Sequence, residues 1–258
     1  MRPLWTGAIG FGLVNIPVKI YSATQTSNLD LDMLDKKDHA NIKYQRINEK
    51  SGKEVQWANI VKGYKVNNEY VVLDDKDFEA AAAKKTKTIE IMDFVKQDEI
   101  GSLYYDTPYY LEPDKSGTRP YELLRQALIK TGKVGIATFV LRNKESLAVL
   151  NPNEKVIVLN KIRFEEEIRD PKDLALPEHT TVKPAELQMA VSLINQLSKK
   201  FDISKYKDTY NEELLKVIHA KAKGTKIKVP QMKVVHSKTK DLMDQLKASL
   251  EVKRKKAS

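Results

Sequence analysis

The sequence predicts a mainly β protein with added helices, and two features of the chain indicate this fold class. Up to about residue 165, short stretches alternate apolar and polar residues and are separated by turn-forming residues, a pattern typical of half-buried strands. From about residue 166 the chain becomes acidic and rich in proline, and helical periodicity then replaces the alternation. Many short strands joined by turns favour a barrel or a sandwich over a doubly wound sheet.

The N-terminal apolar stretch, Leu4 to Ile20, predicts a strand rather than a signal peptide. It contains Asn15, Pro17 and Lys19 and lacks the small-residue cleavage pattern of a secretory signal. No apolar run in the sequence approaches the ~20 residues that a membrane helix needs, so we expect a soluble, cytoplasmic protein that makes no membrane contact. The apolar side chains expected on one face of this first strand are Val14, Ile16, Val18 and Ile20.

A hairpin is predicted over 61–73, because Asn67 and Asn68 tolerate the positive φ angles of a two-residue turn. Asp74 or Asp75 is placed to cap a short helix through the run of four alanines that follows. The other alternating stretches before the first long helix predict strands at 40–47, 55–66, 86–95 and 107–113.

The clearest helix is predicted over 119–131. Thr118 is its candidate N-cap, Pro120 falls in its tolerant first turn, and Gly132 stands where a C-terminal cap belongs. The apolar side chains expected on its buried face are Leu123, Leu124, Ala127 and Leu128. Strands follow at 134–142, 146–150 and 155–164.

Two amphipathic helices are predicted beyond the acidic connector, over 185–199 and 205–222. Their apolar stripes are Leu187, Val191, Ile194 and Leu197 in the first, and Tyr206, Tyr210, Leu214, Val217 and Ile218 in the second. Residues 224–237 read as a flexible basic linker. A last amphipathic segment is expected over 239–252, ahead of a basic end.

Charge is distributed unevenly along the chain. The net charge of +10 equals that of residues 215–258, which hold 13 basic and three acidic side chains, so the rest of the chain is neutral. Within that neutral part, residues 36–65 carry a net +5, residues 66–115 a net −6, and residues 119–163 a net +6. Such segregation predicts one basic and one acidic surface, the usual footprint of a protein that binds a polyanion.

Several kinds of chemistry are not supported by the sequence. With no cysteine there is no disulfide framework, thiol catalysis or thiolate metal site. The residues around Gly132 and Lys133 lack the other positions of a P-loop, and the four histidines are not at metal-ligand spacing. We therefore expect neither a catalytic residue nor a metal nor another cofactor. The residues alone indicate a basic, β-rich nucleic-acid binder with a tail, in which Tyr44 and Tyr64 stand beside lysines.

Several sequence strings carry a more specific indication. They are IGFGLVNIPVKIYSAT (9–24), IVKGY (60–64), YYLEPDK (109–115), TGKVGIA (131–137), VLR (140–142), IRDP (168–171), KYKDTY (205–210) and DLMDQLKASL (241–250). In this order they closely resemble the prokaryotic Ku family of non-homologous end joining proteins, over nearly the whole chain. Many members of that family carry a Cys-x-x-Cys pair where this chain has Asn48 and Ser51, so a metal knuckle proposed for such members is impossible here.

The resemblance implies a homodimer in which each subunit contributes a Ku-type β-barrel with an inserted bridge. The barrel with its bridge would span 1–165, the bridge falling at roughly 28–95, followed by a helical part at 166–223 and a basic tail at 224–258. Two bridges would close a ring around duplex DNA, which binds any sequence and loads from an end. The family recruits a multifunctional ATP-dependent DNA ligase for the chemistry, so this chain would itself be non-catalytic.

The resemblance and the charge pattern together suggest site residues. The side chains expected to contact DNA are Lys36, Lys37, Lys43, Arg46, Lys53, Lys62, Lys65, Arg142, Lys253, Arg254, Lys255 and Lys256. The apolar stripe expected to dock on the ligase is Leu242, Met243, Leu246 and Leu250. Two other readings stay open at this point: a histone-like or RNA-associated basic protein, and a lyase that uses a tail lysine as a Schiff-base nucleophile.

Overall fold

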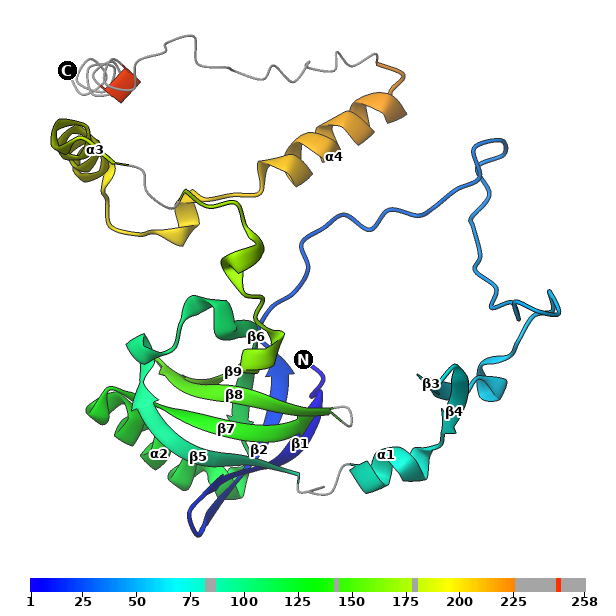
Figure 1. The fold of residues 1–258 in the computed structure, drawn as a ribbon, viewed down its shortest axis with the longest axis horizontal. Helices are drawn as coiled ribbons and strands as arrows, with labels where there is room; N and C mark the ends of the chain where they lie inside the picture. Colours follow the sequence, from blue (N-terminus) through cyan, green and yellow to red (C-terminus); the bar gives the residue numbers. More distant parts are fainter. Residues whose placement is uncertain (82–86, 142–143, 178–180, 226–244, 247–258) are drawn as a thin grey trace. The chain divides into compact units, whose positions relative to one another are not determined.

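A closed barrel of seven strands forms the main body of the chain (Figure 1). The computed structural model describes residues 1–81, 87–141, 144–177, 181–225 and 245–246, and it divides the chain into two units, Met1–Pro171 and Lys172–Ser258. Around the barrel the strands run β1 (Trp5–Phe11), β2 (Val14–Ser22), β6 (Tyr105–Pro113), β9 (Val156–Ile162), β8 (Lys144–Asn153), β7 (Lys133–Leu141) and β5 (Thr88–Lys96). The expected barrel is confirmed.

The N-terminal stretch forms two strands, so the expectation of one strand from Leu4 to Ile20 is wrong. β1 and β2 are an antiparallel hairpin whose turn is at Gly12 and Leu13, where Gly12 has a φ of +57°. A left-handed φ of this kind suits glycine, which has no Cβ to clash. The expected inward face is right for Ile16, Val18 and Ile20, which are fully buried, whereas Val14 beside the turn is exposed.

The barrel closes where β1 meets β5. Every neighbouring pair around the barrel is antiparallel except this one, which is parallel and pairs Ala8 with Thr88. The backbone N–H of Ala8 donates to the carbonyl of Lys87 at 2.9 Å. A Cβ on Gly7 would lie 2.2 Å from that same carbonyl oxygen, so only glycine allows the two strands to approach this closely.

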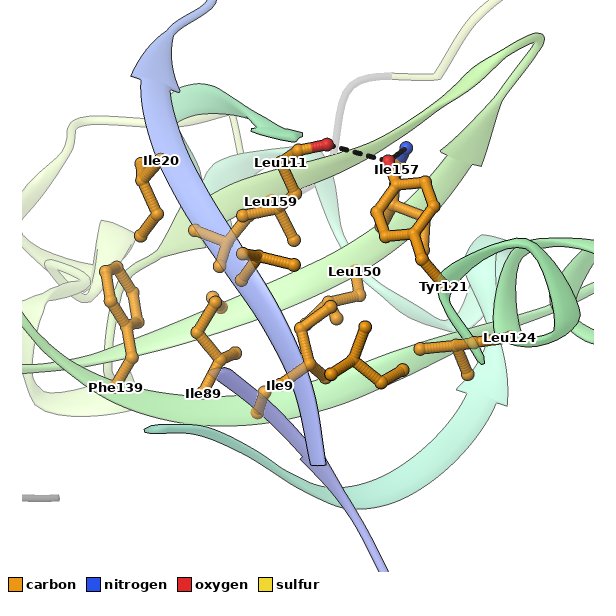
Figure 2. Close-up of a cluster of buried hydrophobic side chains, with 14 of the residues drawn as sticks. Ile9, Ile20, Ile89, Leu111, Tyr121, Leu124, Phe139, Leu150, Ile157 and Leu159 are labelled. Atoms are coloured by element: carbon orange, nitrogen blue, oxygen red, sulfur yellow. Dashed lines mark hydrogen bonds between the residues drawn. The ribbon is translucent and has the colours of Figure 1, made fainter. Parts of the chain in front are cut away.

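Helix α2 (Thr118–Thr131) packs against the barrel through Tyr121, Leu124 and Leu128, which belong to the main core cluster. The Tyr121 hydroxyl donates to the carbonyl of Leu111 and accepts from the backbone N–H of Ile157, both at 2.7 Å (Figure 2). Burial raises the pKa of Tyr121, so this hydroxyl stays protonated and able to donate. Tyr121 therefore ties α2 to β6 and β9 at once.

The ends of α2 test two expectations. Gly132 has a φ of +64° and its N–H bonds back to the helix, so the predicted C-cap is confirmed. The predicted N-cap is wrong, because Gly117 holds that position and the Thr118 hydroxyl donates backwards to the carbonyls of Asp114 and Lys115. The predicted buried face is right for Leu124 and Leu128 only. Leu123 is 71% exposed and Ala127 is exposed, because a single barrel wall contacts one narrow stripe of the helix.

Residues 23–87, the connection between β2 and β5, will be called the insertion. The expected bridge at 28–95 extends too far, since β5 is a barrel strand. The insertion contains the hairpin β3 (Lys62–Val66) and β4 (Glu69–Leu73), followed by helix α1 (Asp75–Ala81). Asn67 and Asn68 form the turn with φ of 47° and 73°, as predicted. Asp74 accepts from the backbone N–H groups of Lys76 and Asp77 and so caps α1.

The strands expected at 40–47 and 55–66 are mostly wrong. Residues 23–61 hold only two isolated bridges, Leu34 with Asn41 and Ile47 with Glu54, and the 3-10 turn η1 at Trp57–Asn59 (Figure 1). Nearly every residue of this stretch is exposed. Alternation marks a strand because one face is buried against a core, and this stretch has no core to face. Only Lys62–Val66, which has β4 as a partner, forms a strand.

The second unit contains helices α3 (Pro184–Leu197) and α4 (Thr209–Ala222), neither of which buries a residue. Asp208 caps α4 by accepting from the N–H groups of Tyr210 and Asn211. Tyr206 therefore lies before the helix, although it was expected inside it.

Within the described residues, no helix has the length and apolar character to cross a membrane. The 3-10 turns after η1 are η2 (Gln97–Glu99), η3 (Ser102–Tyr104), η4 (Lys115–Gly117), η5 (Glu165–Glu167), η6 (Pro171–Asp173) and η7 (Ile203–Lys205).

We predict that Tyr121→Phe lowers the free energy of unfolding by about 1–3 kcal/mol, the cost of leaving a buried polar group without its partner. The substitution keeps the ring but strands the N–H of Ile157, a residue that is 0% exposed. Urea unfolding measures the change. Tyr110→Phe is the matched control, because that hydroxyl makes no hydrogen bond within the described chain and its residue is 37% exposed. Equal losses in the two variants would contradict the prediction.

Candidate nucleic-acid interface

Between residues 36 and 65, eight basic side chains of the insertion are exposed and lack an ion-pair partner within the described chain. They include seven of the side chains expected to contact DNA, together with Lys50. A cation that no carboxylate neutralises keeps its full attraction for a phosphate. The insertion therefore presents concentrated, uncancelled positive charge on Lys36, Lys37, Lys43, Arg46, Lys50, Lys53, Lys62 and Lys65.

Two of these cations lie over aromatic rings. The guanidinium carbon of Arg46 is 4.6 Å from the centre of the Trp57 ring, and the Lys62 Nζ is 4.7 Å from the centre of the Phe78 ring. Cation–π contacts at exposed positions are worth about 0.5–1 kcal/mol each. They hold the two side chains in place without neutralising them. The sequence reading paired tyrosines with lysines and missed both Trp57 and Phe78.

The β3–β4 hairpin separates its two lysines. Successive side chains of a strand point to opposite faces, so Lys62 and Lys65 lie on opposite faces of β3. Lys62 faces the Phe78 ring of α1, whereas Lys65 is directly opposite Tyr70 of β4. Among the described residues Lys65 makes no cation–π contact of the kind that positions Lys62. Because the two lysines also lie on opposite faces, they cannot contribute equally to one binding surface.

A tight turn at Asn48–Gly52 presents Lys50 and Lys53. The Asn48 side-chain oxygen accepts from the backbone N–H groups of Lys50 and Ser51, both at 3.0 Å, and the Asn48 N–H donates to the carbonyl of Lys53. The Ser51 hydroxyl accepts from the N–H of Lys53 at 3.4 Å. Gly52 completes the turn with a φ of +66°. Asn48 and Ser51 thus close this turn by hydrogen bonds.

The second basic block, at 119–163, is partly neutralised. Arg125 donates to both carboxylate oxygens of Glu122, at 2.9 and 2.7 Å, and also to the carbonyl of Glu154. Hydrogen bonds from Arg125, and then from Gln126, lower the pKa of Glu122 to about 2. Glu122 is thus ionised at neutral pH, and its charge cancels that of Arg125.

A similar cluster lies across β6 and β9. Lys161 and Arg163 approach the Asp106 carboxylate at 3.0 and 3.4 Å, and Arg163 also donates to the carbonyls of Leu103 and Tyr105. The hydrogen bond from Lys161 lowers the pKa of Asp106. Arg163 therefore serves to join strands rather than to bind a ligand. Lys144 reaches Glu167 at 3.8 Å, so four basic residues of this block face carboxylates.

A hollow of about 820 Å³ lies beside α2. Its lining includes Tyr21, Tyr110, Glu112 and Glu122. Its carboxylates are already engaged, since the Tyr21 hydroxyl bonds Glu112 and Arg125 bonds Glu122. Lys155 also lines the hollow and has no ion-pair partner within the described chain, but it is a single exposed cation. Among the described residues no cluster of three or more possible metal ligands occurs.

The remaining predicted site residues stay predictions. Of the expected DNA contacts, Arg142, Lys253, Arg254, Lys255 and Lys256 lie outside the described residues. Of the expected ligase contacts, Leu242, Met243 and Leu250 also lie outside them, while Leu246 is helical and partly buried. Of the predicted site residues, the structure thus describes Leu246 and the DNA contacts that belong to the insertion.

Comparison with known proteins decides the family. Residues 10–189, well over half of the chain, match the family model described as the Ku70/Ku80 beta-barrel domain. The chain belongs to the Ku family. The matched span contains the insertion and all seven barrel strands of this chain except the start of β1. The Ku-type barrel expected from the sequence strings is therefore confirmed.

Full-length Ku relatives are similar to the chain from end to end. The "Non-homologous end joining protein Ku" of Archaeoglobus fulgidus is 41% identical, covering 97% of this chain and 99% of its own. The proteins of the same name from Coxiella burnetii and Bacillus subtilis are 38% and 39% identical and cover 98% and 97% of this chain, with 96% and 82% of their own lengths matched. The similarity therefore includes the insertion and the second unit as well as the barrel.

We predict that reversing Lys43, Arg46, Lys62 and Lys65 to Glu abolishes binding to duplex DNA and leaves the barrel folded. These side chains are exposed and none belongs to the barrel core, so the substitutions change the charge of the insertion without disturbing that core. Fluorescence anisotropy of a labelled duplex measures affinity, and thermal unfolding checks the fold.

The matched control reverses Arg119, Lys130, Lys133 and Lys155, which are exposed residues of the barrel unit without a described ion pair. The control changes the net charge by the same amount and should retain most of the affinity. If it lost affinity as completely as the insertion variant, then either total charge or the 119–163 block would carry the binding.

Proposed function

We propose that this Ku chain binds the ends of double-stranded DNA in non-homologous end joining, as a cytoplasmic protein in contact with the nucleoid. The observation that carries the proposal is the insertion, with eight exposed and unneutralised cations between residues 36 and 65. The printed names of the relatives, each a non-homologous end joining protein, support the pathway. The proposed role is binding without catalysis, and it requires no cofactor.

Binding of this kind is independent of sequence. Lysine and arginine side chains on a surface without a base-reading motif contact phosphates, which are the same at every base pair. Single basic side chains distributed over turns and a two-stranded hairpin follow a backbone rather than entering a groove as a recognition helix does. The insertion thus suits a protein that must accept any broken end.

A homodimeric ring is the proposed assembly. The insertion exposes large apolar side chains, among them Tyr64 and Tyr70, which are 70% and 72% exposed. In the second unit, Leu187 and Ile194 of α3 are 57% and 62% exposed. Apolar surface on this scale is unfavourable in a monomer and marks an interaction site, and two-fold pairing covers equal surfaces on both copies. Stiff duplex enters a closed ring only at an end, which explains selection for breaks.

The tail is proposed to have two separate partners. Lys253, Arg254, Lys255 and Lys256 would add salt-sensitive affinity for DNA. The stripe of Leu242, Met243, Leu246 and Leu250 would dock in a groove of a multifunctional ATP-dependent DNA ligase, which performs the joining chemistry. The support is the helical spacing of the stripe, since a segment joined by a basic linker has no evident core to enter.

We predict that linear duplex, but not relaxed closed circular DNA of the same sequence, competes for binding. If the complex neutralises roughly 6–10 phosphates, its affinity for linear duplex falls about 10³–10⁵-fold between 50 and 200 mM salt. Competition gels with equal masses of both DNA forms measure the first effect, and anisotropy titrations over a salt series measure the second.

Sedimentation under the same conditions provides the control, because the ring requires two copies of the chain. A monomer that still preferred linear DNA would contradict the ring. Equal competition by the circle would contradict loading from ends and would favour a general nucleic-acid-coating protein.

A second prediction separates the two roles of the tail. Leu242→Asp with Leu246→Asp should abolish stimulation of the ligase and leave binding to duplex ends unchanged, because only the apolar stripe is altered. Nick or end ligation in the presence of the ligase measures stimulation. The matched variant truncates residues 253–258, which should weaken DNA binding while contact with the ligase persists. A lower melting temperature in the double variant would instead place these leucines in the folded core.

A further inference from the structure

Trp57 is a large exposed aromatic residue in the most basic part of the chain. It opens the 3-10 turn η1, where the N–H of Ile60 donates to its carbonyl at 3.1 Å. Its side chain is 71% exposed and belongs to neither hydrophobic cluster of the barrel. The indole therefore does not pack in a core, and its position is set by the local turn and by its neighbour Arg46.

Arg46 is aligned with Trp57 by the backbone. The N–H of Val55 donates to the Arg46 carbonyl at 2.7 Å, next to the bridge between Ile47 and Glu54. This pairing brings the guanidinium over one face of the indole, at 4.6 Å from the ring centre. A ring has two faces, and the high exposure of Trp57 shows that Arg46 leaves much of the ring accessible.

We propose that Trp57 and Arg46 form a binding site for an unpaired nucleotide at a DNA end. The accessible part of the indole stacks on the base, and the guanidinium contacts the phosphate of the same strand. The proposal rests on the proposed function, since the basic insertion must first bring DNA to this place. The ligand class is a single-stranded overhang of any sequence, because every base has a flat face for stacking.

The pairing of an aromatic ring with a cation favours unpaired over paired DNA. Inside a duplex each base face is covered by its neighbours, so an indole reaches no base without unstacking the helix, which costs a few kcal/mol. An unpaired base offers its face without that cost. Lys53 and Lys62, four residues before and five residues after Trp57 in the sequence, are exposed and unneutralised, so they can supply charge for the adjoining phosphates.

The test follows the fluorescence of Trp57 in a Trp5→Phe background, in which Trp57 is the sole tryptophan, since the chain has two. The probes are a blunt duplex and the same duplex extended by a 3′ or a 5′ unpaired oligothymidine. Quenching is expected with the extended duplexes and not with the blunt one. Trp57→Leu should weaken binding to the extended duplexes by about 5- to 150-fold per stacked base and leave the blunt affinity unchanged, whereas Trp57→Phe should retain most of the preference.

Tyr44→Leu is the matched control. Tyr44 is an exposed aromatic residue of the same insertion, with its hydroxyl 3.3 Å from the Met33 sulfur and no described cation over its ring, so its loss should not discriminate between the probes. Equal loss of blunt and extended affinity in Trp57→Leu would overturn the proposal and reduce Trp57 to a support for Arg46. Conversion of Trp57→Leu to a monomer would also overturn it, by assigning the indole to the dimer surface. Failure of the unsubstituted chain to bind the blunt duplex would instead refute the proposed function.

Discussion

The rest of the structure depends on the parallel pairing of β1 with β5, which closes the barrel. Parallel strands cannot be joined by a tight turn, and β5 must also come after β2, the other neighbour of β1. The chain therefore leaves the barrel at Ser22 and returns at Thr88, and Gly7 lets the Lys87 carbonyl come close enough to bond at this seam. Closure leaves no barrel edge exposed, and it fixes both ends of an insertion that has no core of its own.

This topology also decides which positive charges remain available. Two blocks of nearly equal net charge, +5 at 36–65 and +6 at 119–163, cannot be ranked from the sequence. In the barrel, antiparallel neighbours bring acidic and basic residues together, as β6 and β9 do for Asp106 and Lys161. The insertion has few strand neighbours, so its lysines meet no carboxylate within the described chain. The basic surface arises from the absence of cross-strand partners as much as from the number of lysines.

Sequence reasoning succeeded where the chemistry is local or where one face is buried. Gly132 and the Asn67–Asn68 turn were predictable, because left-handed φ angles restrict the residue type, and the barrel strands were predictable from their alternation. The same alternation at 40–47 was misleading, since no core or partner strand exists there. The contact of Arg46 with Trp57 joins residues on opposite sides of a turn, so no spacing rule indicated it. The strings that resemble Ku supplied the family, which charge and periodicity could not.

The insertion is stabilised piece by piece, and this limits how its residues can affect one another. Asn48 and Ser51 close one turn by hydrogen bonds, Arg46 rests on Trp57, and Lys62 rests on Phe78. No shared core connects these contacts, and sites without common partners contribute to stability almost independently. Each positioning contact therefore governs the cation that it holds and leaves the barrel unaffected. A basic, polyanion-binding surface assembled in this way can lose one cation at a time while the protein keeps its fold.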